Sequence, residues 1–501
     1  MASGAGRIPN SDFDVVIIGA GISGVNTAYR IHNELPNHTY AILEARNSLG
    51  GTWDLFRYPG IRSDSDLFTF GFSWYPWSSP NPIAEGPAIK KYMKDAAARY
   101  GIDQNIYYKH KVNSAHWSGV KKLWSLDVSH GDQPKIVTAR FLIFGTGYYD
   151  YHKTLATAIT GLESFRGTIV HPQFWPEDLN YSNKNVIVVG SGATAITLVP
   201  KLAESAAKVT MLQRSPSYIM SLPNSTSAKK TCLLRILPTA VSLKITRILK
   251  IIISRIFFVF CRTFPGTARQ RLRRATIRQL PKQIAYDPHF KPRYNPWDQR
   301  LCVCPNGDFY KSLHTGRVDI KTDTIKQCTE SGVQLNSGET LHADIVITAT
   351  GLKLQFGGGI SITVDDKQYH LHEKFMWKGT MMEDLPNAAL VIGYTNMSWT
   401  LGADVAGILV CRLLKHLERK RSTALIPRVP AGMHLRRQKM LDLSSTYISK
   451  AENDLPRTAK TGPWQPKSNY IWDLIAAKYG KLEESLEIIY EEPPSENLKE
   501  K

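Results

Sequence analysis

Short apolar runs alternate with amphipathic stretches along the chain, and this pattern predicts two β-α-β units. In the first unit Phe13–Ile18 and Tyr40–Leu43 are expected to be buried strands, separated by a helical stretch that ends near Glu34. In the second unit the expected strands are Asn185–Val189 and Lys208–Leu212, again with a helical stretch between them. Since parallel neighbours require a crossover, usually a helix, both units predict parallel α/β sheets.

A glycine-rich turn follows the first strand of each unit. Gly19-Ala-Gly-Ile-Ser-Gly24 has dinucleotide-binding spacing, in which the glycines permit a tight turn, approach of the backbone to a pyrophosphate, and close helix packing. The second unit has Gly190-Ser-Gly-Ala-Thr-Ala195 at the same place. The helix that starts at each turn would direct its N-terminus at the phosphates. The predicted cofactor contacts are Gly19, Gly21, Ser23, Gly24, Gly190, Ser191, Gly192, Ala193, Thr194 and Ala195.

The residue that ends the second strand distinguishes the two units. Glu44, 20 residues after Gly24, stands where an acid binds a ribose hydroxyl. The second unit ends instead in Gln213-Arg214-Ser215, and an arginine there suits a ribose 2′-phosphate. We therefore predict that the second unit binds NADPH through Arg214 and Ser215, the alternative being a solvated arginine in a basic region.

Two similar turns, Gly145-Thr-Gly147 and Ala349-Thr-Gly351, follow strand-like runs at Phe141–Phe144 and Asp344–Thr348. In flavoproteins with two nucleotide domains, such turns mark where the chain leaves one domain for the other. The predicted fold is α/β, with two Rossmann-like dinucleotide-binding domains for FAD and NADPH, the NADPH domain inserted in the FAD domain, and a helical insertion. The expected parts are 1–150 and 352–501 for the FAD domain with the C-terminal tail, 151–222 and 305–351 for the NADPH domain, and 223–304 for a helical basic subdomain.

The composition fits a large globular chain and excludes some classes. With 501 residues and 43% hydrophobic content, the chain can bury several cores. Its six cysteines form no C-x-x-C pair and no zinc spacing, which favours a reducing compartment and predicts no metal site. The first 12 residues lack the apolar run of a signal peptide, so a cytoplasmic location is expected.

The net charge of +20 is concentrated in one segment. No Asp or Glu occurs between Glu204 and Asp287, where 16 Lys or Arg stand. The aliphatic stretch Leu233–Phe260 is interrupted by charges that exclude a plain spanning helix. Two interpretations stay open: an interfacial helix within 229–278 that makes peripheral contact with an anionic membrane, or a helix whose apolar face packs on the NADPH domain. The basic positions predicted to lie near one side of this helix are Lys244, Arg247, Arg255 and Arg262.

The segment between the two units carries the pattern Phe165-x-Gly167-x-x-x-His171-x-x-x-Trp175-Pro176. It resembles the fingerprint of the type I Baeyer–Villiger monooxygenases. Related flavin monooxygenases that oxidise amines and sulfides usually end this pattern in Tyr, so Trp175 favours the Baeyer–Villiger family. The alternative is that the histidine and the aromatic residues only pack the linker.

The resemblance extends over nearly the whole chain. Gly50–Trp53 and Arg57–Asp64 resemble the flavin-side loops of the family, whereas Lys229–Arg278 is much less similar. Gly51–Gly60, Tyr294–Gly307 and Gly393–Leu401 are similar to a bacterial member. The further flavin contacts that the resemblance implies are Thr52, Trp53, Leu55, Arg62, Asp64, Tyr148 and Arg300.

The resemblance also implies a chemistry and its catalytic residues. NADPH reduces FAD, the reduced flavin captures O₂ as a C4a-peroxide, and this species attacks a ketone to give an ester or lactone. Arg300 would stabilise the anions, and Asp64 would pair with Arg300. His171 and Trp175 would gate the NADPH domain, with direct proton transfer by His171 as an alternative. Gln299 stands where the family often has Lys, which leaves Arg214 as the main 2′-phosphate contact.

Three other functions share features with this sequence. A flavin monooxygenase that oxidises sulfur or nitrogen would use the same two cofactors and O₂. The expected substrate is therefore either a small ketone, for the Baeyer–Villiger reaction, or a sulfide, for this alternative. A disulfide reductase is disfavoured because no redox cysteine pair follows the first helix. A membrane-surface or nucleic-acid binding protein with a degenerate flavoprotein fold is disfavoured by the intact glycine turns. No nucleic-acid partner is expected, because the basic segment is interleaved with aliphatic rather than stacking aromatic residues.

Overall fold

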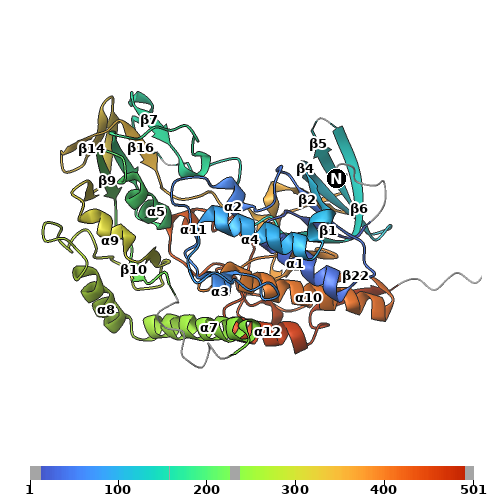
Figure 1. The fold of residues 1–501 in the computed structure, drawn as a ribbon. Coiled ribbons are helices and arrows are strands. Elements are labelled where there is room, and N and C mark those ends of the chain that lie inside the picture. Colours follow the sequence, from blue (N-terminus) through green and yellow to red (C-terminus); the bar gives the residue numbers. More distant parts are fainter. Residues whose placement is uncertain (1–12, 132, 157, 226–236, 491–501) are drawn as a thin grey trace, which may run out of the picture.

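The computed structural model describes residues 13–131, 133–156, 158–225 and 237–490. Two sheets built around parallel strands form neighbouring lobes, one at the upper left and one at the right of Figure 1. The larger sheet has 11 strands, with the path β18-β17-β4-β5-β6-β1-β2-β3. Its strands are β1 (Phe13–Ile18), β2 (Tyr40–Glu44), β3 (Ile106–Tyr108), β4 (His110–Ser118), β5 (Leu123–His130), β6 (Gln133–Phe144), β17 (Ser361–Val364), β18 (Lys367–Tyr369), β19 (Met376–Trp377), β20 (Met381–Met382) and β21 (Ala388–Leu390).

The parallel centre of the larger sheet is the first predicted unit. β1 pairs with β2 in the register Val15↔Tyr40 and with β6 in the register Val15↔Phe141. Its apolar side chains form cores on both faces of the sheet, as expected for buried parallel strands. One face is covered by α1 (Ile22–Glu34) and α10 (Trp399–Lys420), which pack against each other. The other helices of this lobe are α2 (Thr52–Leu55), α3 (Leu67–Phe70), α4 (Gly86–Arg99), α11 (Thr446–Lys450) and α12 (Tyr470–Tyr479).

The smaller sheet is wholly parallel, in the order β12-β9-β8-β16-β7. It contains the second predicted unit, with α5 (Ala193–Leu202) between β8 and β9 and with α9 (Asp308–Leu313) beside it. All five strands fall in sequence between β6 and β17 of the larger sheet, so one sheet is inserted in the other. These strands are β7 (Thr168–Val170), β8 (Asn185–Val189), β9 (Lys208–Gln213), β12 (Val318–Thr322) and β16 (Ile345–Thr348).

The fold class predicted from the sequence is confirmed, with small changes at the strand ends. The run expected at Phe141–Phe144 is the buried end of the longer strand β6, whose first half alternates with exposed positions and escapes a search for apolar runs. The proposed domain bounds stay predictions. The remaining strands are β10 (Ile219–Leu222), β11 (Cys302–Pro305), β13 (Ile325–Thr329), β14 (Gly332–Leu335), β15 (Thr340–His342), β22 (Ser422–Pro427) and β23 (Leu486–Tyr490).

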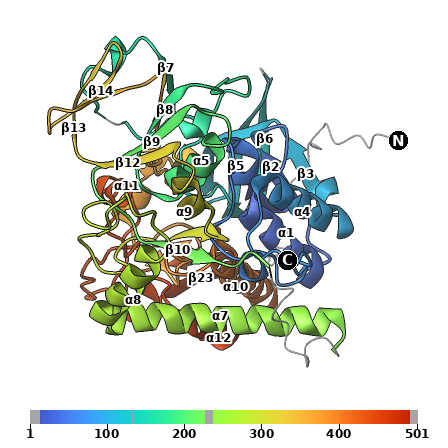
Figure 2. The same ribbon diagram turned by 60° about the vertical axis from the view of Figure 1, so that its left-hand side comes forward.

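The basic segment forms two helices, α7 (Thr239–Thr263) and α8 (Pro265–Ile277). No helix among the described residues is long and apolar enough to cross a membrane. In both views α7 runs along the bottom edge of the molecule with α12 beside it (Figures 1 and 2). α7 contacts α3 of the larger lobe. The interpretation that its apolar face packs on the NADPH domain is therefore wrong; residues 229–236 of the predicted contact segment lie outside the described residues.

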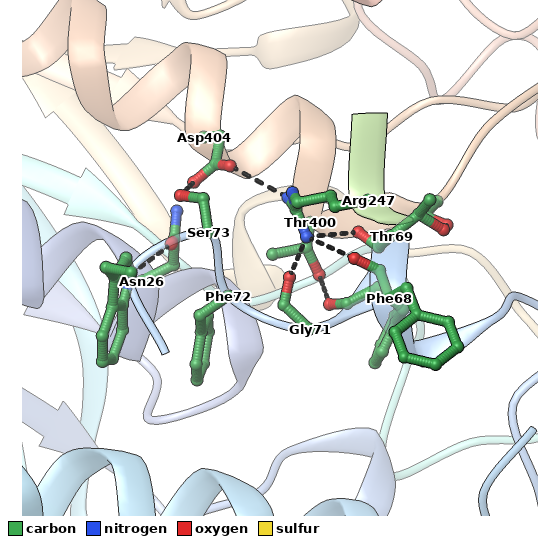
Figure 3. A network of polar contacts seen from close by, with 12 residues as sticks. Asn26, Phe68, Thr69, Gly71, Phe72, Ser73, Arg247, Thr400 and Asp404 are labelled. Carbon is green, nitrogen blue, oxygen red and sulfur yellow. Dashed lines mark hydrogen bonds and ion pairs between the residues drawn. The ribbon is translucent and has the colours of Figure 1, made fainter. Parts of the chain in front are cut away.

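Arg247 binds α7 to the larger lobe (Figure 3). Near the end of the helix Arg262, another predicted member of the basic side, pairs with Asp298 at 2.9 Å and with Asp442 at 3.7 Å. Arg247 Nη1 donates to the carbonyl oxygens of Phe68, Thr69 and Gly71 at 2.9, 3.2 and 2.6 Å. Its Nη2 lies 3.3 Å from Asp404 Oδ2 on α10. The last carbonyls of a helix have no partner within it, and at α3 this guanidinium supplies one. Arg247 therefore faces the protein. The sequence-based prediction that it lies on one basic side of the helix with Lys244 and Arg255 is wrong for this residue.

Candidate active site

A cavity of about 350 Å³ lies at the carboxyl ends of β1, β2 and β6. Parallel sheets bind ligands at this edge because their crossovers leave a crevice there. Gly19 takes a φ of +100°, and a Cβ there would lie 2.9 Å from the carbonyl oxygen of Gly145. The glycine is therefore required by the turn. The predicted flavin contacts that line this cavity are Gly19, Gly21, Ser23, Glu44, Thr52, Trp53, Arg62, Asp64, Tyr148 and Arg300.

A second cavity of about 720 Å³ lies at the carboxyl ends of β8, β9 and β16. The Ser191 hydroxyl donates to the Ser215 carbonyl at 2.8 Å, which joins the turn after β8 to the turn after β9. A Cβ built on Gly192 would meet no atom within 4 Å, so this turn leaves open space for a ligand. The predicted NADPH contacts that line the cavity are Gly190, Ser191, Gly192, Ala193, Thr194, Arg214 and Ser215.

The two cavities adjoin, and several side chains line both. Among them are Asp64, Tyr148, Thr194 and Arg300. A ligand in either cavity therefore comes within reach of the same residues. This arrangement can place two nucleotide-shaped ligands end to end, with their reactive ends at Arg300.

Arg300 is held by backbone carbonyls. Its Nε donates to Thr395 O at 3.3 Å and its Nη2 to Tyr394 O at 3.1 Å. A guanidinium has five N–H groups, so the other three remain available to a ligand. Burial would lower its pKa, but the neighbouring Tyr148, Tyr447, Tyr149 and Asp64 more than offset this, and the net shift is upward. Arg300 is therefore a permanent cation at the junction of the cavities.

Asp64 lies beside Arg300 without a direct ion pair. No contact between their charged atoms falls within 4.0 Å in the described part of the chain. Burial raises the pKa of Asp64, and the positive charges of Arg300 and Arg62 oppose this rise. Arg62 itself is paired with Asp308 of the smaller lobe. In this conformation Asp64 and Arg300 interact electrostatically but form no direct contact.

Glu44 is largely occupied by its own loop. The side chain is buried, and Oε2 accepts the N–H of Ala20 at 2.7 Å while Oε1 accepts that of Arg46 at 2.9 Å. Burial raises its pKa in spite of these two bonds. A carboxylate accepts about four hydrogen bonds. Glu44 therefore keeps capacity for a ribose hydroxyl while it also fixes the glycine turn.

Arg214, in contrast, is exposed at the mouth of the second cavity. Its Nη2 donates to Thr446 Oγ1 at 3.1 Å, and it forms no ion pair with any described residue. Lys450 of α11 lines the same cavity. Sequence reasoning missed Lys450 because it follows no motif and lies 236 positions from Arg214 in the sequence. The second cavity is therefore lined by two cations that could hold a phosphate group.

Three predicted contacts lie outside the cavity linings. A Cβ on Gly24 would approach the carbonyl oxygen of Gly19 to 1.9 Å, so this glycine serves close packing. Ala195 is buried in the core of the smaller lobe, and Leu55 packs against that core. These three residues thus pack against the protein and do not line either cavity.

The linker fingerprint likewise lies away from the cavities. A Cβ on Gly167 would lie 2.4 Å from the Asp344 carbonyl oxygen, and Phe165 is buried below. His171 Nδ1 accepts the N–H of Gln173 at 3.2 Å. Burial lowers the pKa of His171, and the backbone of Gly351 counteracts this shift. Trp175 packs on the core of the smaller lobe. This placement favours a positioning role for both residues over contact with substrate.

Aromatic residues surround Arg300, among them the predicted flavin contact Tyr148, Trp399 of the stretch Gly393–Leu401, and Tyr447, which belongs to no motif. Trp399 stacks on Tyr148 at 4.7 Å and donates to Ser23 Oγ at 2.8 Å. Tyr447 lines a small cavity of about 20 Å³ that includes Arg300 and Trp399. The lining of this cavity comes from parts of the chain that are far apart in the sequence, namely Tyr148, Arg300, Phe356, Ile392–Thr395, Trp399 of α10, Leu441, Leu443, and Tyr447 and Ile448 of α11. Tyr447 belongs to no motif, so the sequence did not indicate it.

The residues present fit FAD and NADPH. Each glycine turn opens on its cavity beside a helix N-terminus, which suits a pyrophosphate. The first loop has a buried carboxylate for a ribose, and the second has cations for an additional phosphate. The described residues contain no cluster of His, Cys, Asp or Glu suited to a metal ion.

Fold and site together define a flavoprotein with two dinucleotide-binding domains, and the comparisons specify the class further. A family model described as flavin-binding monooxygenase-like matches residues 13–395. The FAD-containing monooxygenase EthA of Mycolicibacterium smegmatis is 44% identical over 474 residues, 94% of this chain and 96% of that protein. The chain therefore belongs to the flavin-binding monooxygenase-like family, which confirms the family resemblance seen in its motifs.

Solved structures share the fold. An oxidised steroid monooxygenase bound to NADP matches with a TM-score of 0.73 at 20% identity, covering 96% of this chain and 100% of that one. An open cyclohexanone monooxygenase matches with a TM-score of 0.72 at 19% identity, covering 95% and 99%. At this identity the match supports the architecture alone.

Proposed function

We propose that this protein is an NADPH- and O₂-consuming FAD monooxygenase of the Baeyer–Villiger type, which inserts one oxygen atom beside a ketone carbonyl. The observation that carries the proposal is Arg300, a partly buried cation that lines both nucleotide cavities and the small aromatic cavity. The linker fingerprint ending in Trp175 supports it. The solved neighbour named as a cyclohexanone monooxygenase gives further support, since cyclohexanone is a ketone.

FAD binds the first cavity and NADPH the second, and together these cofactors supply the redox chemistry that activates O₂. The helix N-termini of α1 and α5 orient the pyrophosphates. Arg300 places its free N–H groups where negative charge develops on oxygen, and its bonds to Tyr394 O and Thr395 O keep it in place. Trp399, Tyr148 and Tyr447 exclude water around it.

Asp64 positions Arg300 by its charge. His171 and Trp175 act as positioning residues through the segment that connects the lobes, because neither lines a cavity. Arg214 and Lys450 hold the 2′-phosphate of NADPH. Lys450 thereby fills the role of a second cation that Gln299 cannot supply.

The test supplies the purified, FAD-loaded enzyme with NADPH, isotopically labelled O₂ and a panel of ketones and sulfides. The expected result is an ester or lactone that carries one labelled oxygen, with one NADPH oxidised for each product formed. Conversion of sulfides to labelled sulfoxides without any ester from the ketones would replace this proposal with heteroatom oxidation.

A further inference from the structure

The outer face of α7 is an apolar stripe that nothing in the described structure covers. Ile253 and Ile256 are 58% and 62% exposed. At 100° per residue, the exposed apolar positions of this helix fall within an arc of about 140°. An exposed apolar surface of this extent is typical of an interaction site. The members of the stripe are Val241, Ile248, Leu249, Ile252, Ile253, Ile256 and Val259.

Basic residues border this stripe. On the same helical wheel Lys244 and Arg255 lie along one edge of it, on the side towards the inward-facing Arg247. α8 adds further arginines that are exposed and form no ion pair with any described residue. No acidic residue occurs between Glu204 and Asp287 to neutralise them. The exposed arginines of α8 are Arg269, Arg271, Arg273 and Arg274.

α12 extends the apolar surface beside α7. Trp472 is 68% exposed, and Ile471, Ile475 and Tyr479 lie on the same side of this helix. Asp473, the acid of α12, accepts a hydrogen bond from Tyr394 at 2.8 Å. The two helices lie side by side in both views (Figures 1 and 2). Their inner sides meet where Ile251 of α7 and Tyr470 of α12 pack on one buried cluster.

We propose that α7 and α12 form a docking surface for an anionic phospholipid membrane. Aliphatic side chains enter the boundary between headgroups and acyl chains, and the flanking lysine and arginines bind acidic headgroups. Tryptophan and tyrosine on α12 suit the headgroup level, because each ring has an apolar body and a polar group. Docking goes beyond the proposed oxidation and requires no turnover.

The positive charge around the apolar stripe favours an anionic membrane over a second copy of the chain as the partner of this surface. A twofold contact would place the same basic border opposite itself, and like charges would repel. A bilayer with acidic lipids supplies the opposite charge over the whole length of α7, which is about 37 Å for 25 residues. Arg247 keeps the helix on the protein with its apolar side outward.

The experiment is co-sedimentation of the FAD-loaded protein with vesicles. One set contains phosphatidylcholine with phosphatidylglycerol, and the other phosphatidylcholine alone. We expect binding to the first set, much weaker binding to the second, and release by NaCl, because salt shortens the screening length from about 10 Å at 0.1 M to about 3 Å at 1 M. Lys244→Gln should weaken binding by up to about fivefold.

The decisive variant is Ile253→Glu/Ile256→Glu, which places two carboxylates in the stripe and should reduce vesicle binding by about tenfold or more. Val120→Glu/Ile136→Glu is the matched control, since these residues are 92% and 64% exposed on the strands and turns of the larger sheet. It should bind vesicles like the parent. NADPH oxidation of both variants shows that they are folded.

Equal vesicle binding by the parent and by Ile253→Glu/Ile256→Glu would overturn the proposal, as would no binding to anionic vesicles at low salt. Sedimentation velocity covers the other occupant. A parent that is dimeric, does not bind vesicles and becomes monomeric in the double variant would assign the surface to a second copy instead.

Discussion

The two nucleotide-binding loops have the same backbone plan and use charge in opposite ways. In the first loop Glu44 is buried and accepts two backbone N–H groups, so the charge is part of the turn itself. In the second loop Arg214 is exposed and contacts one hydroxyl. The hydrogen bonds of the buried Glu44 fix the backbone of the first loop, whereas the backbone of the second loop does not depend on the exposed Arg214. If FAD and NADPH bind as proposed, the charge of the first loop is already fixed before its cofactor binds, whereas that of the second loop is free to turn towards its coenzyme.

The two loops also differ at the last position of the glycine motif, Gly24 in the first loop and Ala195 in the second. Gly24 cannot carry a side chain, because its Cβ would lie 1.9 Å from Gly19 O. The corresponding position of the second loop already holds Ala195, whose side chain is buried in a core. The first loop therefore approaches its own helix more closely than the second, and the comparison can be tested from both sides.

The largest effect is expected at Arg300, which both loops share. Arg300→Ala removes the cation at the junction of the cavities, and the rate of product formation should fall by about 10²–10³, or roughly 2.7–4 kcal/mol. FAD content should stay near that of the parent. Arg300→Lys should restore little, because an ammonium lacks the planar fork. The measurement is product formed per NADPH consumed, and near-parental coupling in Arg300→Ala would place the anion-binding group elsewhere.

Asp64→Ala should give a milder form of the same defect, because Arg300 stays but loses a neighbouring charge. The double variant should be no worse than Arg300→Ala alone if the two residues act as a unit. Fully additive losses would contradict the positioning role assigned to Asp64.

A smaller effect is expected from the exposed charges of the second loop. Arg214→Ala should reduce the preference for NADPH over NADH by about 1.5–3 kcal/mol, the range of a charge-assisted bond to phosphate. Lys450→Ala should act in the same direction and add to it. The measurement is kcat/KM for both coenzymes. Lys184→Ala, an exposed lysine at the opposite edge of the smaller sheet, is the control and should leave the ratio unchanged.

The glycines give a direct test of the difference between the loops. Gly24→Ala should lower the free energy of unfolding by about 1–3 kcal/mol through overpacking, with loss of FAD. Gly192→Ala adds a methyl group to open space and should change stability by less than about 0.5 kcal/mol, while KM for NADPH rises. Thermal unfolding and flavin absorbance measure both. Equal destabilisation by the two substitutions would remove the contrast.

The smallest effect concerns a buried charge outside both loops. Burial lowers the pKa of Lys467 from 10.5 to about 8. Between these values the unfolded chain holds more protons than the native protein, so this residue makes the free energy of unfolding rise with pH, by at most about 1.4 kcal/mol per unit. Lys467→Met should flatten that slope, whereas Lys478→Met, at an exposed position, should not. Denaturant unfolding at pH 8 and above measures it, and parallel slopes in all three proteins would refute it.

The sequence revealed the elements whose pattern is local. Both β-α-β units, their glycine turns and the two crossing turns could be predicted, because strand burial and turn geometry follow from neighbouring residues. The surroundings of Arg300 could be predicted only in part: Tyr148 and Asp64 were named, whereas Tyr447 reaches Arg300 from α11 through tertiary packing and was missed. Lys450 was missed for the same reason. The inward direction of Arg247 depended on where α3 ends, which no helical pattern contains.

The insertion of one sheet in the other also sets how the lobes can move. The chain crosses between them at Gly145–Gly147 and at Ala349–Gly351, and a body attached at two points keeps one easy degree of freedom, rotation about the line that joins them. α7 adds a third attachment, because it belongs in sequence to the smaller lobe and is bound by Arg247 to the larger. Three attachment points that are not collinear define a fixed relative orientation. Rotation of the smaller lobe therefore requires release of the Arg62–Asp308 pair between the lobes, together with either release of Arg247 or bending of the segments that flank α7 and α8.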